Sequence, residues 1–131
     1  MTGAVDPIEL QVLSGGLRAI CDEMGAVLVR ASYSPNIKER HDCSTALFDA
    51  GGELVMQAEH IPVHLGSMPA SGESVAALAG GGPIAADDLW ILNDPFHGGT
   101  HLPDITLISP LLLADGLAGW VASRAHHADV G

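Results

Sequence analysis

Residues 6–31, DPIELQVLSGGLRAICDEMGAVLVRA, decide the first and longest element of the fold. The run Asp6-Pro7-Ile8-Glu9 is typical of a helix start, with Asp at the N-cap, Pro at the first helical position and Glu at the third. Apolar residues then recur at steps of three and four, at Leu10, Leu13, Leu17, Ile20, Met24, Val27 and Ala31. This stripe predicts one long amphipathic helix over about residues 7–32, which ends before Ser34-Pro35-Asn36.

Beyond this helix, turns that contain glycine or proline divide the chain into short apolar runs, a pattern typical of strands. The runs predict strands at residues 45–49, 53–57, 89–93, 105–109 and 119–124. The first two flank Ala50-Gly51-Gly52 and predict a hairpin, and Asp115-Gly116 predicts the turn between the last two. Residues 67–79 predict a second helix, which begins at Ser67 or Ser71 and ends at a glycine run.

The predicted helices and strands do not alternate as regular strand–helix–strand units, and no internal repeat or linker divides them. The sequence therefore predicts an α+β fold in which the long N-terminal helix packs on a mixed or antiparallel sheet. The length of 131 residues suits one domain, so we expect a single domain over residues 1–131. Its 47% hydrophobic and 16% charged residues fit a packed core better than a disordered chain.

The charge balance and the cysteine content exclude several classes of protein. Sixteen acidic residues against five lysines and arginines give a formal net charge of −11, which leaves no basic patch for nucleic acid or a membrane surface. The most apolar stretch, residues 105–122, contains Pro110 and Asp115 and is too interrupted to span a bilayer. Cys21 and Cys43 form no zinc or disulfide pattern, and the first residues lack the basic region of a secretory signal, so we expect a cytoplasmic protein.

Histidines and carboxylates cluster at the ends of predicted strands and in loops. The histidines lie at positions 41, 60, 64, 97, 101, 126 and 127, and most have an acidic residue within three positions. Imidazole nitrogens and carboxylate oxygens bind divalent zinc, manganese or iron, and loops at sheet edges hold such ligands in place. We therefore expect a composite metal site rather than scattered surface residues.

Residues 93–104, NDPFHGGTHLPD, have the composition of a shaped loop. Gly98-Gly99 permits backbone conformations that other residues avoid, and the two prolines fix the entry and exit directions. The loop brings His101 and Asp104 together at the start of a predicted strand, which favours ligands over a tight turn with incidental polar residues. No lysine follows the glycine pair as in a P-loop, so nucleotide binding here is disfavoured.

Two other histidine pairs differ in how they can share a face. Glu59-His60-Ile61-Pro62-Val63-His64 has histidines four apart, but Pro62 disfavours the zinc-binding helix that this spacing serves. In an extended segment the same two histidines would still line one surface. If the last predicted strand continues, His126 lies on the face of Arg124 and His127 lies on the opposite face. Only one of these two histidines can then face a metal ion that is also bound by a residue earlier in the chain.

Two smaller features have alternative interpretations. Cys43 lies beside Asp42 with His41 nearby, but adjacency in sequence is not a catalytic triad, and a partly buried strand cysteine is favoured. The cationic segment 36–40, NIKER, is either solvated charge after the helix or an anion-binding element near the site. No GxSxG nucleophile motif is present.

Four stretches are specific enough to identify a resemblance: SPNIKERHDCSTALFD (34–49), MQAEHIPVHLGSMP (56–69), LNDPFHGGTHLPDITLISP (92–110) and SRAHHADVG (123–131). Together they resemble the hydantoinase B/5-oxoprolinase family, which includes N-methylhydantoinase B subunits and the related acetone carboxylase subunit. The opening helix, DPIELQVLSGGLRAICDEMG (6–25), also fits, so the resemblance covers almost the whole chain. It implies that the chain corresponds to the N-terminal part of a longer subunit.

The resemblance implies the metal-dependent subunit of an ATP-dependent amidohydrolase. A hydantoinase A-like partner would bind ATP and phosphorylate the carbonyl oxygen of a small cyclic amide, such as a hydantoin, 5-oxoproline or lactam-like ring. The present subunit would then open the ring hydrolytically within a hetero-oligomer. By resemblance, the metal ligands would be Asp42, His101, Asp104 and His126. Ligand support, proton transfer or substrate contact would fall to Glu59, His60, His64 and His127.

Two alternatives accompany this interpretation. The first is an ATP-dependent carboxylase of the acetone carboxylase type, which would use the same metal centre to join an activated ketone to carbon dioxide. The second is a non-catalytic fragment that binds the metal or the A-type partner. The intact metal motifs favour the two enzymes, whereas the short length of the chain favours the fragment.

Overall fold

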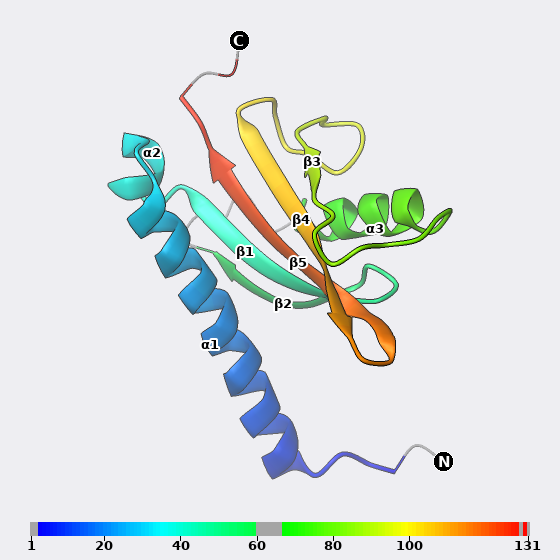
Figure 1. The fold of residues 1–131 in the computed structure, drawn as a ribbon. Coiled ribbons are helices and arrows are strands. Elements are labelled where there is room, and N and C mark those ends of the chain that lie inside the picture. Colours follow the sequence, from blue (N-terminus) through cyan, green and yellow to red (C-terminus); the bar gives the residue numbers. More distant parts are fainter. Residues whose placement is uncertain (1–2, 60–66, 129, 131) are drawn as a thin grey trace.

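The computed structural model describes residues 3–59, 67–128 and 130. The described residues form α1 (Pro7–Ala31), α2 (Pro35–Lys38), β1 (Cys43–Asp49), β2 (Leu54–Glu59), α3 (Met68–Ala79), β3 (Trp90–Leu92), β4 (Asp104–Leu113) and β5 (Gly116–His126). The strands form a five-stranded sheet in the order β2-β1-β5-β4-β3, and each neighbouring pair is antiparallel (Figure 1). Helices pack on this sheet, so the predicted α+β class is confirmed.

α1 confirms the predicted long helix and its start. The Asp6 carboxylate accepts a hydrogen bond from the Ile8 amide at 2.9 Å, and Pro7 occupies the first turn. The helix ends at Ala31, after which Ser32 has an extended backbone. In Figure 1 the N-terminal turns of α1 extend beyond the sheet. Within the described ranges, no helix combines the length and the apolar character that crossing a membrane requires.

The face that α1 buries overlaps the predicted apolar stripe only in part, since Leu17 and Met24 of the stripe pack against the sheet. Its buried residues are Cys21 and Gly25, which turn toward β1 and β2, whereas Leu13 is 56% exposed and Val27 is 50% exposed. The Thr45 hydroxyl donates a hydrogen bond to the Cys21 carbonyl oxygen at 2.6 Å and ties the helix to β1. The helix was predictable from apolar spacing, but the contacting face is set by the small residues that lie against the sheet.

The two long helices cover opposite faces of the sheet. Consecutive strand residues point to opposite sides, so Leu47 packs with the α1 cluster while Phe48 packs with the α3 cluster. On the α3 side, Met68 and Val75 pack on the sheet in a core that includes Trp120. Burial of such side chains stabilises the fold by about 1.5–3 kcal/mol each. The α3 face is therefore the main core, and it adjoins the candidate site.

The predicted hairpin and the later strands are confirmed; four strands are longer than predicted, β4 and β5 most of all, and β3 is shorter. β4 continues through Pro110, which is buried and pairs with Trp120 of β5. β3 pairs with β4 as far as Ile108, so among the described residues no strand lies against the outer edge of β4 at Pro110. A proline lacks an amide hydrogen and is tolerated where one edge of a strand needs no donor.

Candidate metal centre

Three polar side chains meet where β4 begins and β5 ends. The antiparallel register sets Asp104 opposite His126, and His101 lies in the loop just before β4. The Asp104 carboxylate is 3.0 Å from His101 Nδ1 through one oxygen and 2.9 Å from His126 Nδ1 through the other. Because an ionised carboxylate only accepts hydrogen bonds, Nδ1 of each imidazole is the donor when Asp104 is ionised. The potential ligand atoms of these three residues all lie within 4.8 Å of one another.

Burial of the cluster is uneven, which gives it a closed side and an open side. The Asp104 side chain is fully buried, whereas the His126 side chain is 26% exposed and the His101 side chain is 50% exposed. The two imidazole rings have centroids 4.9 Å apart, and their planes are tilted by 36°. Thr100 also donates its hydroxyl hydrogen to Asp104. A solute would therefore reach the cluster from the histidine side.

The loop before the cluster is organised by Asp94. Its carboxylate accepts a hydrogen bond from the Phe96 amide at 2.9 Å and pairs with His97 Nδ1 at 2.6 Å, while its carbonyl oxygen accepts from the Gly99 amide at 2.8 Å. The Phe96 amide, and next the His97 imidazole, lower the pKa of the Asp94 carboxyl. Gly98 has φ 94°, a conformation that favours glycine. These contacts shape the turn that leads to His101.

Asp42 reaches the same end of the sheet through its backbone. His41, just before it, has φ 54°, an uncommon value for a residue other than glycine. The resulting turn lets the Asp42 amide donate to Asn36 and lets its carbonyl oxygen accept from the His126 amide at 3.0 Å. The Asp42 carboxylate is not within the 4.8 Å group, so its role as a fourth ligand stays a prediction.

Comparisons with known proteins identify the family of the chain. The family model described as hydantoinase B/oxoprolinase matches residues 6–131. The chain belongs to this family. It is 49% identical to the 5-oxoprolinase of Saccharomyces cerevisiae over 128 residues, and 36% identical to the caprolactamase subunit beta of Pseudomonas jessenii over 127 residues. These matches cover 97% of the chain, but 10% and 22% of the two relatives.

Two solved structures share the fold of the chain. The crystal structure of ATP-dependent caprolactamase from Pseudomonas jessenii matches 98% of the chain with a TM-score of 0.84 and 33% identity. The nucleotide-free structure of acetone carboxylase matches 97% with a TM-score of 0.86 and 25% identity. The chain spans 22% and 17% of those structures, so it corresponds to a small part of each.

The residues predicted to support the ligands are not all placed at the cluster. Glu59 ends β2, where its backbone pairs with Ser44, and His60 and His64 lie outside the described residues. His127 lies on the α1 side of the sheet, as strand alternation predicts, and lines a largely apolar cavity of about 430 Å³ with Leu28 and Ile37. The catalytic roles assigned to these family positions stay predictions.

The alternative nucleophile, Cys43, is fully buried in β1. Burial, and secondly the charge of Asp42, raises the pKa of the Cys43 thiol. A buried thiol with a raised pKa is a poor nucleophile, so the structure favours the interpretation of Cys43 as a core strand residue.

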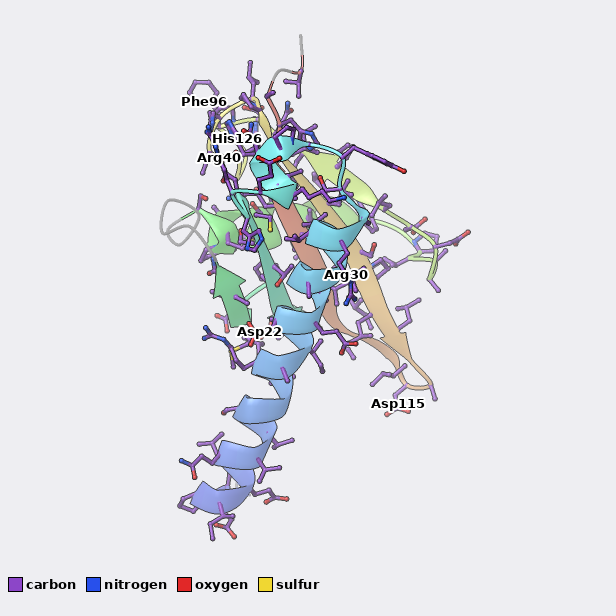
Figure 2. All side chains as sticks on the ribbon, turned by 90° about the vertical axis from the view of Figure 1, so that its left-hand side faces the viewer. Asp22, Arg30, Arg40, Phe96, Asp115 and His126 are labelled. Carbon is purple, nitrogen blue, oxygen red and sulfur yellow. The ribbon has the colours of Figure 1, made fainter. Side chains whose placement is uncertain are left out.

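Sequence reasoning missed one prominent group beside the cluster. Arg124 is fully buried, and its guanidinium donates to Thr106, Ser67, Ser71 and Gly98. Burial lowers the pKa of Arg124, and the neighbouring charge of Asp104 raises it. The available signal was strand alternation, which put Arg124 on the face of His126, but a single arginine gave no hint of its four acceptors. Figure 2 shows His126 at the same end of the molecule as Arg40 and Phe96.

Proposed function

We propose that the chain carries the metal centre of an ATP-dependent cyclic amide hydrolase. In this proposal a hydantoinase A-like partner uses ATP to phosphorylate the carbonyl oxygen of a small hydantoin, 5-oxoproline or lactam-like ring. The metal-containing subunit then opens the ring with water. The observation that carries the proposal is the His101–Asp104–His126 cluster, found in a member of the hydantoinase B/oxoprolinase family.

The chemistry of the cluster fits a divalent cation. Two imidazole nitrogens and a carboxylate oxygen are the donors that zinc, manganese and iron accept, and a three-residue set leaves positions for water and substrate. Asp42 is the proposed fourth ligand, since its backbone is bonded to His126. When bound, the cation would supply a Lewis acid that polarises the substrate and lowers the pKa of water.

The remaining chemistry falls to the side chains of the chain itself. The buried Asp104 carboxylate holds both imidazoles in one tautomer, with Nδ1 protonated, before any cation binds. Thr100 fixes the rotation of that carboxylate by donating to it. The half-exposed imidazole of His101 lies on the open side, where a substrate ring would arrive. These contacts orient the ligands and reduce the rearrangement that binding requires.

Hydrolysis is preferred over carboxylation because the amide-hydrolysing relative is the more similar of the two solved structures in sequence, at 33% against 25% identity. The relative from Pseudomonas jessenii is a caprolactamase subunit beta, which supports a hetero-oligomer. A cytoplasmic location, expected from two free and buried cysteines, is part of the same proposal. So is the organisation of residues 1–131 as one domain.

Metal analysis of the purified chain tests the centre directly. After incubation with equal amounts of zinc, manganese and ferrous iron, we expect about one divalent metal ion per wild-type chain. Asp42→Ala and His101→Ala should each lower this content, and His97→Ala, which removes an exposed histidine of the same loop outside the ligand set, should lower it less. Equal metal contents in wild type and His101→Ala would refute the ligand set.

Reconstitution with a hydantoinase A-like subunit tests the reaction. We expect release of ADP and of the opened ring to require both subunits, and Asp104→Asn to abolish ring opening. Labelled bicarbonate distinguishes the carboxylase alternative, because incorporation of the label into a ketone substrate would favour carboxylation. A wild-type chain that binds metal but supports neither reaction would favour the non-catalytic fragment.

A further inference from the structure

Arg124 is the most completely buried cation in the part of the chain that the structure describes. It lies on β5 two residues before His126, on the same face of the sheet, and its side chain has no exposed surface. Nε donates to Thr106 Oγ1 at 2.7 Å, and Nη2 donates to Ser71 Oγ at 2.6 Å and to the Gly98 carbonyl oxygen at 2.9 Å. Nη1 donates to Ser67 Oγ.

These acceptors come from three segments that are far apart in sequence. Thr106 belongs to β4, and Gly98 belongs to the loop that leads to His101. Ser67 is the N-cap residue of α3, and Ser71 lies in the first turn of that helix. All of these acceptors are neutral, and the charge of the neighbouring Asp104 also acts on the guanidinium. Burial of a cation costs several kcal/mol, and an apolar side chain would often stabilise such a position as well or better. The buried guanidinium therefore serves to fix the relative positions of the segments that it joins, more than to stabilise the fold.

The contact with Gly98 links Arg124 to the metal ligands. The Gly98 carbonyl oxygen accepts from Arg124 and also from the Ser71 hydroxyl, so two donors fix it. His101 follows three residues later, and its carbonyl oxygen accepts from the Asp104 amide at 2.9 Å. Holding the loop at Gly98 thus restricts where the His101 imidazole can lie relative to the Asp104 carboxylate.

We propose that Arg124 is a positioning residue, whose guanidinium fork joins β4, α3 and the Gly98 loop and so holds His101 at the metal centre. The expected effect of Arg124 on metal binding rests on the proposed function. Its expected effect on the position of the loop rests only on the hydrogen bonds given above. Shape distinguishes Arg124 from a simple counter-charge, because lysine keeps the charge but cannot donate to acceptors in three directions with the same planar geometry.

Arg124→Lys tests this inference in the metal-free chain by hydrogen exchange. The Gly99 and Asp104 amides report on the loop, since they donate to Asp94 and His101. We expect their exchange in Arg124→Lys to be faster by about tenfold or more, because the loop opens more often. Ser123→Ala is the matched control, since Ser123 lies next to Arg124 but faces the α1 side of the sheet. Ser71→Ala, which keeps the arginine, should show a smaller increase and replaces Arg124→Lys if that variant does not fold.

A Co²⁺ titration of the same variants, at a temperature where circular dichroism shows them folded, measures the consequence for the metal centre. We expect Kd for Co²⁺ to rise about 10- to 100-fold in Arg124→Lys, with a changed visible spectrum, and to stay within about threefold of wild type in Ser123→Ala. Unchanged exchange at both amides, or an unchanged Kd and spectrum, would overturn the positioning role. Failure of wild type to bind Co²⁺, combined with faster loop exchange in Arg124→Lys, would refute the proposed metal centre and support the positioning of the loop.

Discussion

Replacing Gly98 with alanine should damage both stability and the candidate metal centre. Gly98 has φ 94°, and a Cβ built on it would lie 2.7 Å from the Ala70 carbonyl oxygen and 2.8 Å from the Ser71 Cα. Real Cβ atoms essentially never come so close. Both contacts are to the backbone of α3, which cannot rotate away as a flexible side chain would. The substitution must therefore move the loop or the helix.

The expected loss of stability has two parts. Holding an alanine at a positive φ costs about 1–3 kcal/mol, and overpacking against a fixed backbone costs about 1–3 kcal/mol more. We expect Gly98→Ala to lower the free energy of unfolding by about 2–6 kcal/mol, a large fraction of the roughly 5–15 kcal/mol of a typical domain. Displacement of the Gly98 carbonyl oxygen also removes an acceptor of Arg124, so the affinity for metal should fall.

Gly116→Ala separates the cost of the positive φ from the cost of overpacking. Gly116 has φ 116° but a Cβ there would meet no atom within 4 Å. It follows Asp115 at the end of the β4–β5 hairpin that is far from His126, as Figure 2 shows. We expect Gly116→Ala to cost the conformational term alone, about 1–3 kcal/mol, and to leave metal binding unchanged.

Urea unfolding followed by tryptophan fluorescence measures these values, because Trp120 is buried in the core and packs edge-on against Trp90 at 5.4 Å. The reasoning is refuted if Gly98→Ala and Gly116→Ala lower the free energy of unfolding by the same amount. It is also refuted if Gly98→Ala binds Co²⁺ as tightly as wild type while remaining folded.

Two further predictions concern the thiols and the paired histidines. Burial raises the pKa of both the Cys21 and Cys43 thiols above the ordinary 9.0, so neither should react with a disulfide reagent at neutral pH until the chain is denatured. The stability that these raised pKa values contribute should be complete below pH 9.0 and lost as the pH rises through the folded-state pKa, which alkaline urea titrations would show. His126→Ala should abolish Co²⁺ binding while His127→Ala leaves the Kd within about threefold, since the two side chains face opposite sides of the sheet; equal losses would contradict this geometry.

The fold could be predicted where its signals are local. Asp6 and Pro7 mark the start of α1 by their own chemistry, and glycine turns mark the ends of the strands. The buried face of α1 could not be predicted in the same way, because Cys21 and Gly25 contact the sheet only once the helix and strands have been placed together. The extension of β4 through Pro110 has a similar cause, since it depends on where β3 stops pairing.

The sequence could predict which residues form the candidate site, but not how all of their side chains are arranged. Clustered histidines and acids identify His101, Asp104 and His126 as candidates, and strand alternation separates His126 from His127. The neutral acceptors of Arg124 come from positions up to 57 residues away in the chain, so no local pattern reveals them. The backbone of Asp42 follows a positive φ at His41, a conformation that residues other than glycine adopt uncommonly, so its place at the end of the sheet could not be predicted either.

The pairing of Asp104 with His126 depends on a register shift within the β4–β5 hairpin. Next to the turn, Leu112 pairs with Leu117, but one position farther on Leu111 pairs with Gly119, so Ala118 is an extra residue on β5. Without this shift the same register would set Asp104 opposite Ala125, whose side chain packs on the α1 side. A one-residue slip turns every side chain of a strand to the other face, so the bulge brings both Arg124 and His126 to the face of Asp104. The candidate metal centre therefore depends on an irregularity at the opposite end of the hairpin, about eight residues from the candidate ligands that it aligns.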